Sequence, residues 1–160
     1  MDGTAVNGHS RSSAVSADGR YVAFDPQTTN LLLGNDPCSP NSCVFLRDTC
    51  TNASSGCVPS TIPISVAMDG TVAGNSQLFS ITPDGRYVAF GGNWPNIVAG
   101  GTNGVYQEHL RDTCNGAPPR CAPSTSVASI SSSGAFADES RYDGSVNSTG
   151  RFVRLPLRRR

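Results

Sequence analysis

One nine-residue phrase occurs almost unchanged twice in this chain of 160 residues, and the repeat behind it constrains the fold more than any other feature. The first copy, SADGRYVAF, starts at Ser16, and the second, TPDGRYVAF, starts 66 residues later at Thr82. A weaker third copy, VNSTGRFV, places Gly150 65 residues after Gly85. Self-similarity at a fixed period is typical of repeat architectures, in which each unit buries its faces against its neighbours.

Each repeat period has room for four short strands. Asp-Gly is a hairpin-turn dipeptide, because Gly accepts positive φ and Asp tolerates the left-handed region. Asp18-Gly19 and Asp84-Gly85 therefore predict turns, and Gly150 marks the matching turn of the third copy. YVAF is apolar at every position, which indicates a strand covered on both faces. The apolar segments predict strands at 13–17, 20–24, 43–49 and 60–67, and again at 78–82, 86–90, 104–113 and 124–131.

Four antiparallel strands per repeat, stacked against neighbouring repeats, form the blade of a β-propeller. We therefore predict an all-β fold, a partial β-propeller with two four-stranded antiparallel blades and the start of a third. The 17 glycines and 11 prolines favour short strands and many turns. Disorder is the competing interpretation of such a composition, but the apolar clusters recur too regularly for it. The predicted parts are a flexible N-terminus (1–9), blade one (10–75), blade two (76–141), an incipient third blade (142–155) and a basic tail (156–160).

Two long loops are expected between the second and third strands of the blades, at 26–42 and 92–103. Each contains a short apolar run, NLLLG at 30–34 and NIVAG at 96–100. We expect these runs to tuck apolar side chains under the sheet, with a fifth strand as the alternative.

The repeated residues carry a family resemblance over most of residues 10–155. The pattern S-x-DGRYVAF…NL…G…VF-x-RDTC…GC-x-PST…SV resembles the PD40 class of WD40-like repeats found in TolB-type propellers. The resemblance implies a bacterial, extracytoplasmic protein. It says little about activity, because such blades serve in scaffolds, in binding modules and in the propeller domains of some peptidases alike.

Two departures from that pattern concern the length and the third copy. A ring of about four to eight blades is longer than this chain. In the third copy Arg154 and Leu155 stand where the other copies have Ala-Phe, and a buried Arg is costly without a partner. We therefore expect a truncated or frame-shifted end, and a fragment of a larger propeller.

The six cysteines favour disulfides. C-x6-C recurs at Cys50/Cys57 and Cys114/Cys121, each time in the loop after RDT, where the chain reverses. The remaining candidates, Cys38 and Cys43, would staple their own loop. Zinc is the alternative for the four cysteines of the first copy, but the second copy repeats only one pair. Disulfides imply an oxidising compartment, hence a periplasmic, cell-surface or secreted protein whose signal peptide is missing from this chain.

The charge balance argues against nucleic acid as a partner. The net charge is zero, but five arginines lie in the last ten residues; without them, seven basic face twelve acidic residues, a net charge of −5. A nucleic-acid surface requires a basic face on the folded body. No apolar run reaches the length of a membrane span, about 20 residues.

The sequence shows no catalytic constellation, so we predict a non-enzymatic protein without a cofactor or metal. His9 lies near the N-terminus, and a lone strand residue, His109, is interpreted as structural. Arg47-Asp48 and Arg111-Asp112 are expected to be salt-bridged strand ends, with a ligand role as the lesser alternative. Loops 34–41 and 100–104 offer oxygen ligands for calcium, but they lack the spacing of a calcium loop. Glycosylation patterns at Asn52 and Asn147 are treated as coincidental, because the resemblance points to bacteria.

The predicted function is that of an extracytoplasmic scaffold or binding propeller that contacts protein or carbohydrate through its loop faces. The alternative is the propeller part of a larger hydrolase or peptidase whose catalytic domain is absent, since no G-x-S-x-G nucleophile elbow occurs. A third hypothesis is self-association through exposed strand edges, with several chains completing one ring.

Overall fold

The computed structural model describes residues 7–28, 30–31, 38, 42–102, 104–140 and 142–155. Every regular element among these residues is a β-strand, so the chain is all-β, as predicted. The ten strands are β1 (His9–Val15), β2 (Tyr21–Gln27), β3 (Phe45–Asp48), β4 (Ser60–Pro63), β5 (Ser76–Ile81), β6 (Tyr87–Gly92), β7 (Gln107–Asp112), β8 (Ser124–Val127), β9 (Ser145–Val146) and β10 (Val153–Arg154).

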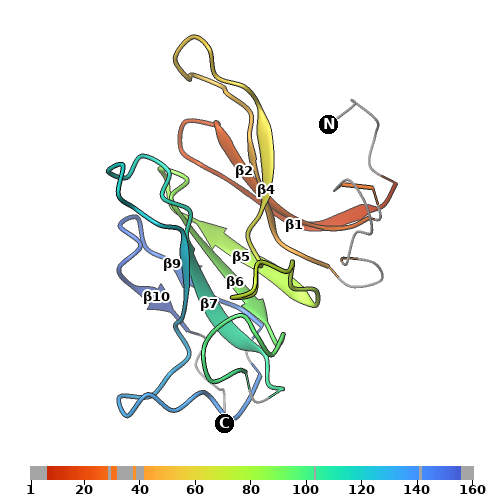
Figure 1. The fold of residues 1–160 in the computed structure, drawn as a ribbon, viewed down its shortest axis with the longest axis vertical. Helices are drawn as coiled ribbons and strands as arrows, with labels where there is room; N and C mark the ends of the chain where they lie inside the picture. Colours follow the sequence, from red (N-terminus) through yellow and green to blue (C-terminus); the bar gives the residue numbers. More distant parts are fainter. Residues whose placement is uncertain are drawn as a thin grey trace.

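The strands form three antiparallel sheets that follow the three copies of the repeat. The first two are four-stranded, in the orders β1-β2-β3-β4 and β5-β6-β7-β8, and β9 pairs with β10 in the third. Figure 1 shows the second sheet between the first sheet and the β9–β10 hairpin. Each sheet is a meander of neighbouring strands, which is the arrangement of partial propeller blades.

The registers between the second and third strands of the two large sheets match position by position. Phe24 pairs with Phe45 in the first sheet, and Phe90 pairs with His109 at the corresponding place in the second. Both first strands also carry an irregularity in the same region, between Ser10 and Ser13 in β1 and between Leu78 and Ser80 in β5. The sequence repeat is therefore a repeat of structure down to single residue pairs.

The fourth strands are shorter than predicted. β4 ends at Pro63 and β8 ends at Val127, because the chain then leaves the sheet. The amides of Ile64 and Ser65 both donate to the carbonyl of Val44, and Val66 forms an isolated bridge with Val72. The second copy repeats this bend, with a bridge between Ile130 and Phe136.

The main hydrophobic core lies between the two large sheets. It combines side chains of both, because β1 and β2 of the first sheet pack against β5 of the second. The apolar phrase YVAF is buried accordingly: Val88, Ala89 and Phe90 of β6 are at most 1% exposed. The core residues are Ala23, Val44, Leu46, Ile64, Ala73, Leu78, Val88, Phe90 and Ile97.

A smaller cluster covers the other face of the first sheet. It contains Leu31, Cys38, Cys43 and Phe45, all buried. The apolar runs of the long loops thus contribute to both cores, through Leu31 in the first copy and Ile97 in the second. Neither described part forms a fifth strand, and residues 32–34 of the first run lie outside the described residues.

The third copy keeps the geometry of the repeat in a short hairpin. The alignment with Ala23 and Ala89 predicts a buried Arg154. Its side chain is instead 72% exposed, and its Nη2 lies 3.6 Å from Oδ2 of Asp143. The expected cost of a buried charge therefore does not arise here, because no further sheet covers this face in the described part of the chain. The predicted basic tail (156–160) and residues 1–6 of the predicted flexible N-terminus lie outside the described residues, whereas His9 already belongs to β1.

Candidate functional site

The Asp-Gly turns depend on glycine for φ and on aspartate for side-chain hydrogen bonds. Gly19, Gly85 and Gly150 all have positive φ, between 72° and 76°. Asp18 does not use the left-handed region; its Oδ1 instead accepts bonds from the Ser16 hydroxyl at 2.6 Å and from the Arg20 amide at 3.0 Å. These bonds lower the pKa of Asp18, the one from Ser16 most.

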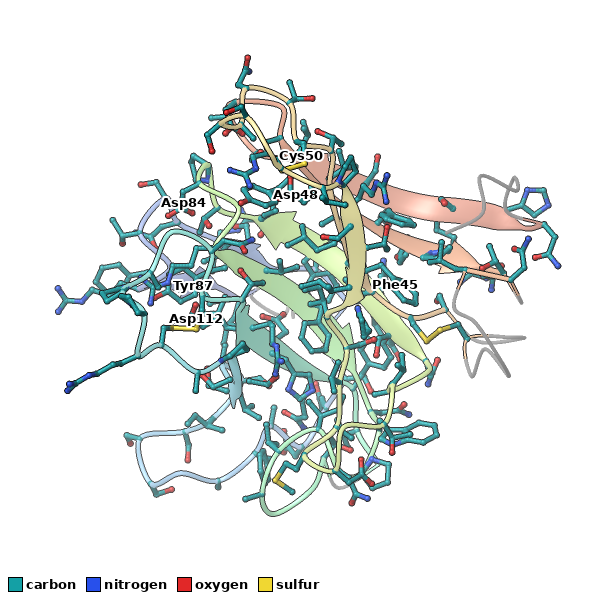
Figure 2. All side chains as sticks on the ribbon, turned by 45° about the horizontal axis from the view of Figure 1, so that its top comes forward. Phe45, Asp48, Cys50, Asp84, Tyr87 and Asp112 are labelled. Atoms are coloured by element: carbon teal, nitrogen blue, oxygen red, sulfur yellow. A yellow bond between two sulfur atoms is a disulfide. The ribbon has the colours of Figure 1, made fainter. Side chains whose placement is uncertain are left out.

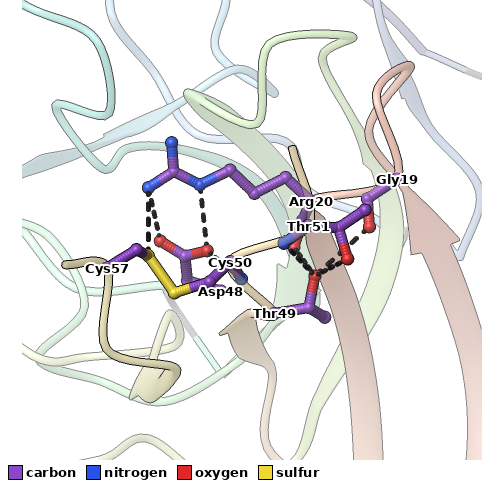
Figure 3. Close-up of a disulfide and its surroundings, with 7 residues drawn as sticks. All are labelled: Gly19, Arg20, Asp48, Thr49, Cys50, Thr51 and Cys57. Atoms are coloured by element: carbon purple, nitrogen blue, oxygen red, sulfur yellow. Dashed lines mark hydrogen bonds and ion pairs between the residues drawn. A yellow bond between two sulfur atoms is a disulfide. The ribbon is translucent and has the colours of Figure 1, made fainter. Parts of the chain in front are cut away.

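A clamp joins each turn to the loop after the third strand. In the first copy, Nε and Nη2 of Arg20 donate to the two carboxylate oxygens of Asp48, at 3.0 and 2.8 Å (Figure 3). The Arg20 guanidinium lowers the pKa of Asp48. Oδ1 of Asp48 also accepts the amide of Cys50, so this one carboxylate holds both the turn and the loop.

The second copy builds the same clamp from Arg86, Asp112 and Cys114. The two arginine–carboxylate distances are again 3.0 and 2.8 Å, and the amide of Cys114 donates to Asp112 at 2.8 Å. Figure 2 shows Asp48 and Asp112 next to the disulfides of their own loops. The clamp is therefore a property of the repeat.

Asp48 and Asp112 end their strands in salt bridges, as predicted, but their partners are Arg20 and Arg86 and not the neighbouring arginines of the same strands. Neighbouring residues of a strand point to opposite faces, so they cannot form a close ion pair. Arg47 and Arg111 instead donate to Thr61 and Thr125 on the fourth strands, at 3.2 and 3.0 Å. The partners of the two aspartates come from the DGR turn, for which the sequence pattern predicts only a turn role.

The six candidate cysteines form three disulfides, Cys38–Cys43, Cys50–Cys57 and Cys114–Cys121. The second and third of these close the loops after the third strands, which carry the clamps, and Figure 3 shows the one between Cys50 and Cys57. The groupings Asp48/Cys50/Cys57 and Asp112/Cys114/Cys121 resemble ligand sets in spacing alone. Their sulfurs are bonded to each other, so no thiolate is left to bind zinc.

The repeated glycines have a second role at the contact between neighbouring sheets. The ring of Tyr21 lies directly on Gly85, so that a Cβ atom there would overlap the ring. The ring of Tyr87 lies on Gly150 in the same way. We call the glycine of each repeated turn a seat, and the aromatic residue two positions after it a ring. The turns also bond directly, from the amide of Ala17 to the carbonyl of Pro83 at 2.8 Å.

Asp25 makes a further link between the two large sheets. Its side chain is fully buried, and it accepts the amides of Ser12 in its own sheet and Leu78 in the next, at 2.5 and 3.2 Å. Burial raises the pKa of Asp25. The second copy has Gly91 at this place, against Tyr106 and Phe79, so this carboxylate link is particular to the first junction.

An open groove with a volume of about 550 Å³ lies at the same junction. Its walls are mostly apolar, and Arg111 supplies the one cationic group; burial lowers the pKa of that guanidinium. Met68, 64% exposed, stands at the rim. The lining residues are Val66, Ala67, Met68, Gly70, Ile97, Val98, Ala99, Arg111, Pro123, Ser124 and Thr125. No motif pointed to this groove, because it forms where separate loops meet.

The two histidines lie in different environments. His9 is exposed in β1, whereas His109 is fully buried in β7, with its ring centroid 5.1 Å from that of Phe90. Nε2 of His109 lies 3.3 Å from the carbonyl oxygen of Gly92. Burial lowers the pKa of His109 to about 4. This neutral imidazole takes the place that Phe45 has in the first sheet, so its position is structural.

Comparisons with known proteins identify no relative whose site could be compared with this one. No model of a known protein family matches the chain, and a search of curated proteins finds no match. Within the described residues, no helix is long and apolar enough to cross a membrane.

Proposed function

We propose that this chain is a non-enzymatic scaffold or binding module built from β-propeller blades of the WD40-like PD40 type. The observation that carries the proposal is the seat-and-ring contact, which joins Tyr21 to Gly85 and Tyr87 to Gly150. The residues that recur in the sequence are used for stacking and for clamping the turns. What differs between the copies lies in the loops, where a binding surface can vary without loss of the fold.

The three disulfides indicate an oxidising environment outside the cytoplasm. We place the protein in the periplasm, at the cell surface or among secreted proteins of a bacterium. There, the clamped loops hold one edge of the sheet stack in shape, and the groove beside Arg111 offers a contact surface for protein or carbohydrate. Its apolar walls with a single guanidinium favour an acidic sugar or a peptide with a carboxylate.

Binding to defined probes tests this function. The disulfide-bonded protein is offered to an array of neutral and acidic oligosaccharides and to a library of unstructured peptides. We expect saturable binding of one class, weakened at least tenfold by Met68→Asp at the groove rim. Val58→Asp, at a residue 78% exposed outside the groove, is the matched control. Absence of saturable binding to both classes, or chemical conversion of a bound probe, would overturn the proposal.

A further inference from the structure

We propose that the chain associates head to tail with a second copy of itself, with Phe152 of one copy seated on Gly19 of the next. The inference rests on the blade stacking of the proposed function but does not depend on its groove. The chain carries three seats, Gly19, Gly85 and Gly150, and three rings, Tyr21, Tyr87 and Phe152. Among the described residues, two seat-and-ring pairs form, and Gly19 and Phe152 belong to neither of them.

The remaining seat and the remaining ring are both open. No described atom lies within 4 Å of the place where a Cβ atom of Gly19 would be, whereas rings fill that place at Gly85 and Gly150. The side chain of Phe152 is 62% exposed. One chain therefore presents both halves of a contact that it already makes twice internally.

Phe152 is held in the same way as the two rings that are already seated. The guanidinium carbon of Arg151 lies 5.1 Å from its centroid, and the corresponding distances are 4.9 Å for Arg20 over Tyr21 and for Arg86 over Tyr87. The amide of Phe152 donates to Asn147 Oδ1 at 2.9 Å, which replaces the hydroxyl used in the other copies. The ring is thus preorganised for a seat, which lowers the entropic cost of docking.

The surroundings of the Gly19 seat also match those of a filled seat. Val15 next to it is 58% exposed, while its counterpart Ile81 is partly buried against the shared core. The amide of Ala17 donates to Pro83 across the internal junction. Ser148 stands at the place of Ala17 in the third copy, so its amide would donate to the Ala17 carbonyl of a second chain. A contact of this kind is heterologous and leads to a ring or to an open filament.

Arg154 sets the strength of this contact. The corresponding residues Ala23 and Ala89 are buried, so a second chain would partly cover Arg154 together with its partner Asp143. Covering a charged pair costs more than covering a methyl group. The association is therefore weaker than the internal junctions, and Arg154→Ala should tighten it about tenfold.

Sedimentation of the disulfide-bonded protein over a range of concentrations tests the proposal. We expect the mass of the unmodified chain to rise with concentration, and both Phe152→Asp and Gly19→Asn to remain monomeric when alone. Asn tolerates the positive φ of Gly19 better than other side chains, and its Cβ blocks the seat. An equimolar mixture of the two variants keeps one intact seat and one intact ring, so it should form dimers and nothing larger. Misfolded variants would not regain association in this mixture.

Two controls separate this contact from the groove and from general effects of substitution. Gly134→Asn changes a glycine with a similar positive φ and similarly open surroundings away from Gly19, and it should associate like the unmodified chain. Met68→Asp should weaken groove binding at least tenfold and leave the association unchanged. A chain that stays monomeric at all concentrations, or variants that still associate alone, would overturn the proposal and leave the binding function standing.

Discussion

The buried carboxylate of Asp25 accepts the backbone amide of Leu78 from the neighbouring sheet at 3.2 Å. The same carboxylate accepts the amide of Ser12 at the irregularity in β1, where the ladder to β2 is interrupted. Asp25 therefore satisfies a defect within one sheet and joins that sheet to the next. A buried amide without an acceptor costs about 1–3 kcal/mol, so this one side chain has a large effect on the junction.

We expect Asp25→Ala to lower the free energy of unfolding by about 2–3 kcal/mol, because it leaves the amides of Ser12 and Leu78 without an acceptor. The loss is smaller than two full penalties, because the substitution also removes a carboxylate whose charged form is disfavoured by burial. Urea unfolding at neutral pH measures the change. Asp138→Ala, at an exposed aspartate, is the control and should have little effect. Equal stability of the two variants would contradict the prediction.

The seats predict different effects for equivalent glycine substitutions. Gly85→Ala places a Cβ atom at a residue with positive φ, and this atom also overlaps the ring of Tyr21. We therefore expect the free energy of unfolding to fall by at least about 3 kcal/mol. Gly19→Ala meets only the cost of positive φ, about 1–2 kcal/mol, because its surroundings are open. Denaturant unfolding of the two variants at a concentration where the chain is monomeric isolates the ring contact, and equal losses would show that Tyr21 does not depend on the seat.

The fold could be predicted from the sequence because it depends on local signals that the repeat doubles. Asp-Gly turns, apolar strands and paired cysteines are all readable within a few residues, and a second copy removes ambiguity about their register. The partner of Asp48 could also have been found from strand alternation, since Arg47 points to the opposite face. Instead, adjacency in the sequence suggested the wrong pair.

Other parts of the site depend on packing between distant segments. The link from Asp25 to Leu78 requires the irregularity in β1 and the angle between two sheets, neither of which is encoded in a motif. The groove forms where the bend around Met68 meets the loop at Val98 and the strand of Arg111. The second role of Gly85 is visible only when the ring of Tyr21 is in place.

His109 makes the stability of the chain depend on pH. Its pKa is about 4 in the folded state and about 6.5 when unfolded, so between these values the unfolded state binds the additional proton. Neutral His109 makes its full contribution to the free energy of unfolding above pH 6.5. This contribution is lost as the pH falls toward 4, a change of about 3 kcal/mol.

We therefore expect His109→Phe, which installs the residue of the first sheet, to flatten the decline in stability between pH 7 and pH 4.5. The carboxylates titrate in both proteins, so the difference between their unfolding midpoints reports on His109 alone. Substituting the exposed His9 with Phe should leave the decline as it is. Identical pH profiles for the unmodified chain and His109→Phe would show that the buried imidazole does not titrate on unfolding.

The disulfides predict both a thiol count and a cost of removal. Without reductant, the denatured protein should show no free thiol, and after reduction it should show six. Replacing Cys114 and Cys121 together with Ala should lower the free energy of unfolding by about 2–3 kcal/mol, because the bond closes a short loop whose freedom in the unfolded chain is restored. The clamp between Arg86 and Asp112 should persist, since its two hydrogen bonds do not involve sulfur. The double Asp112→Asn, Arg86→Gln variant with the disulfide intact is the matched comparison. If the cysteine variant were as stable as the unmodified chain, the clamp and not the disulfide would hold this loop.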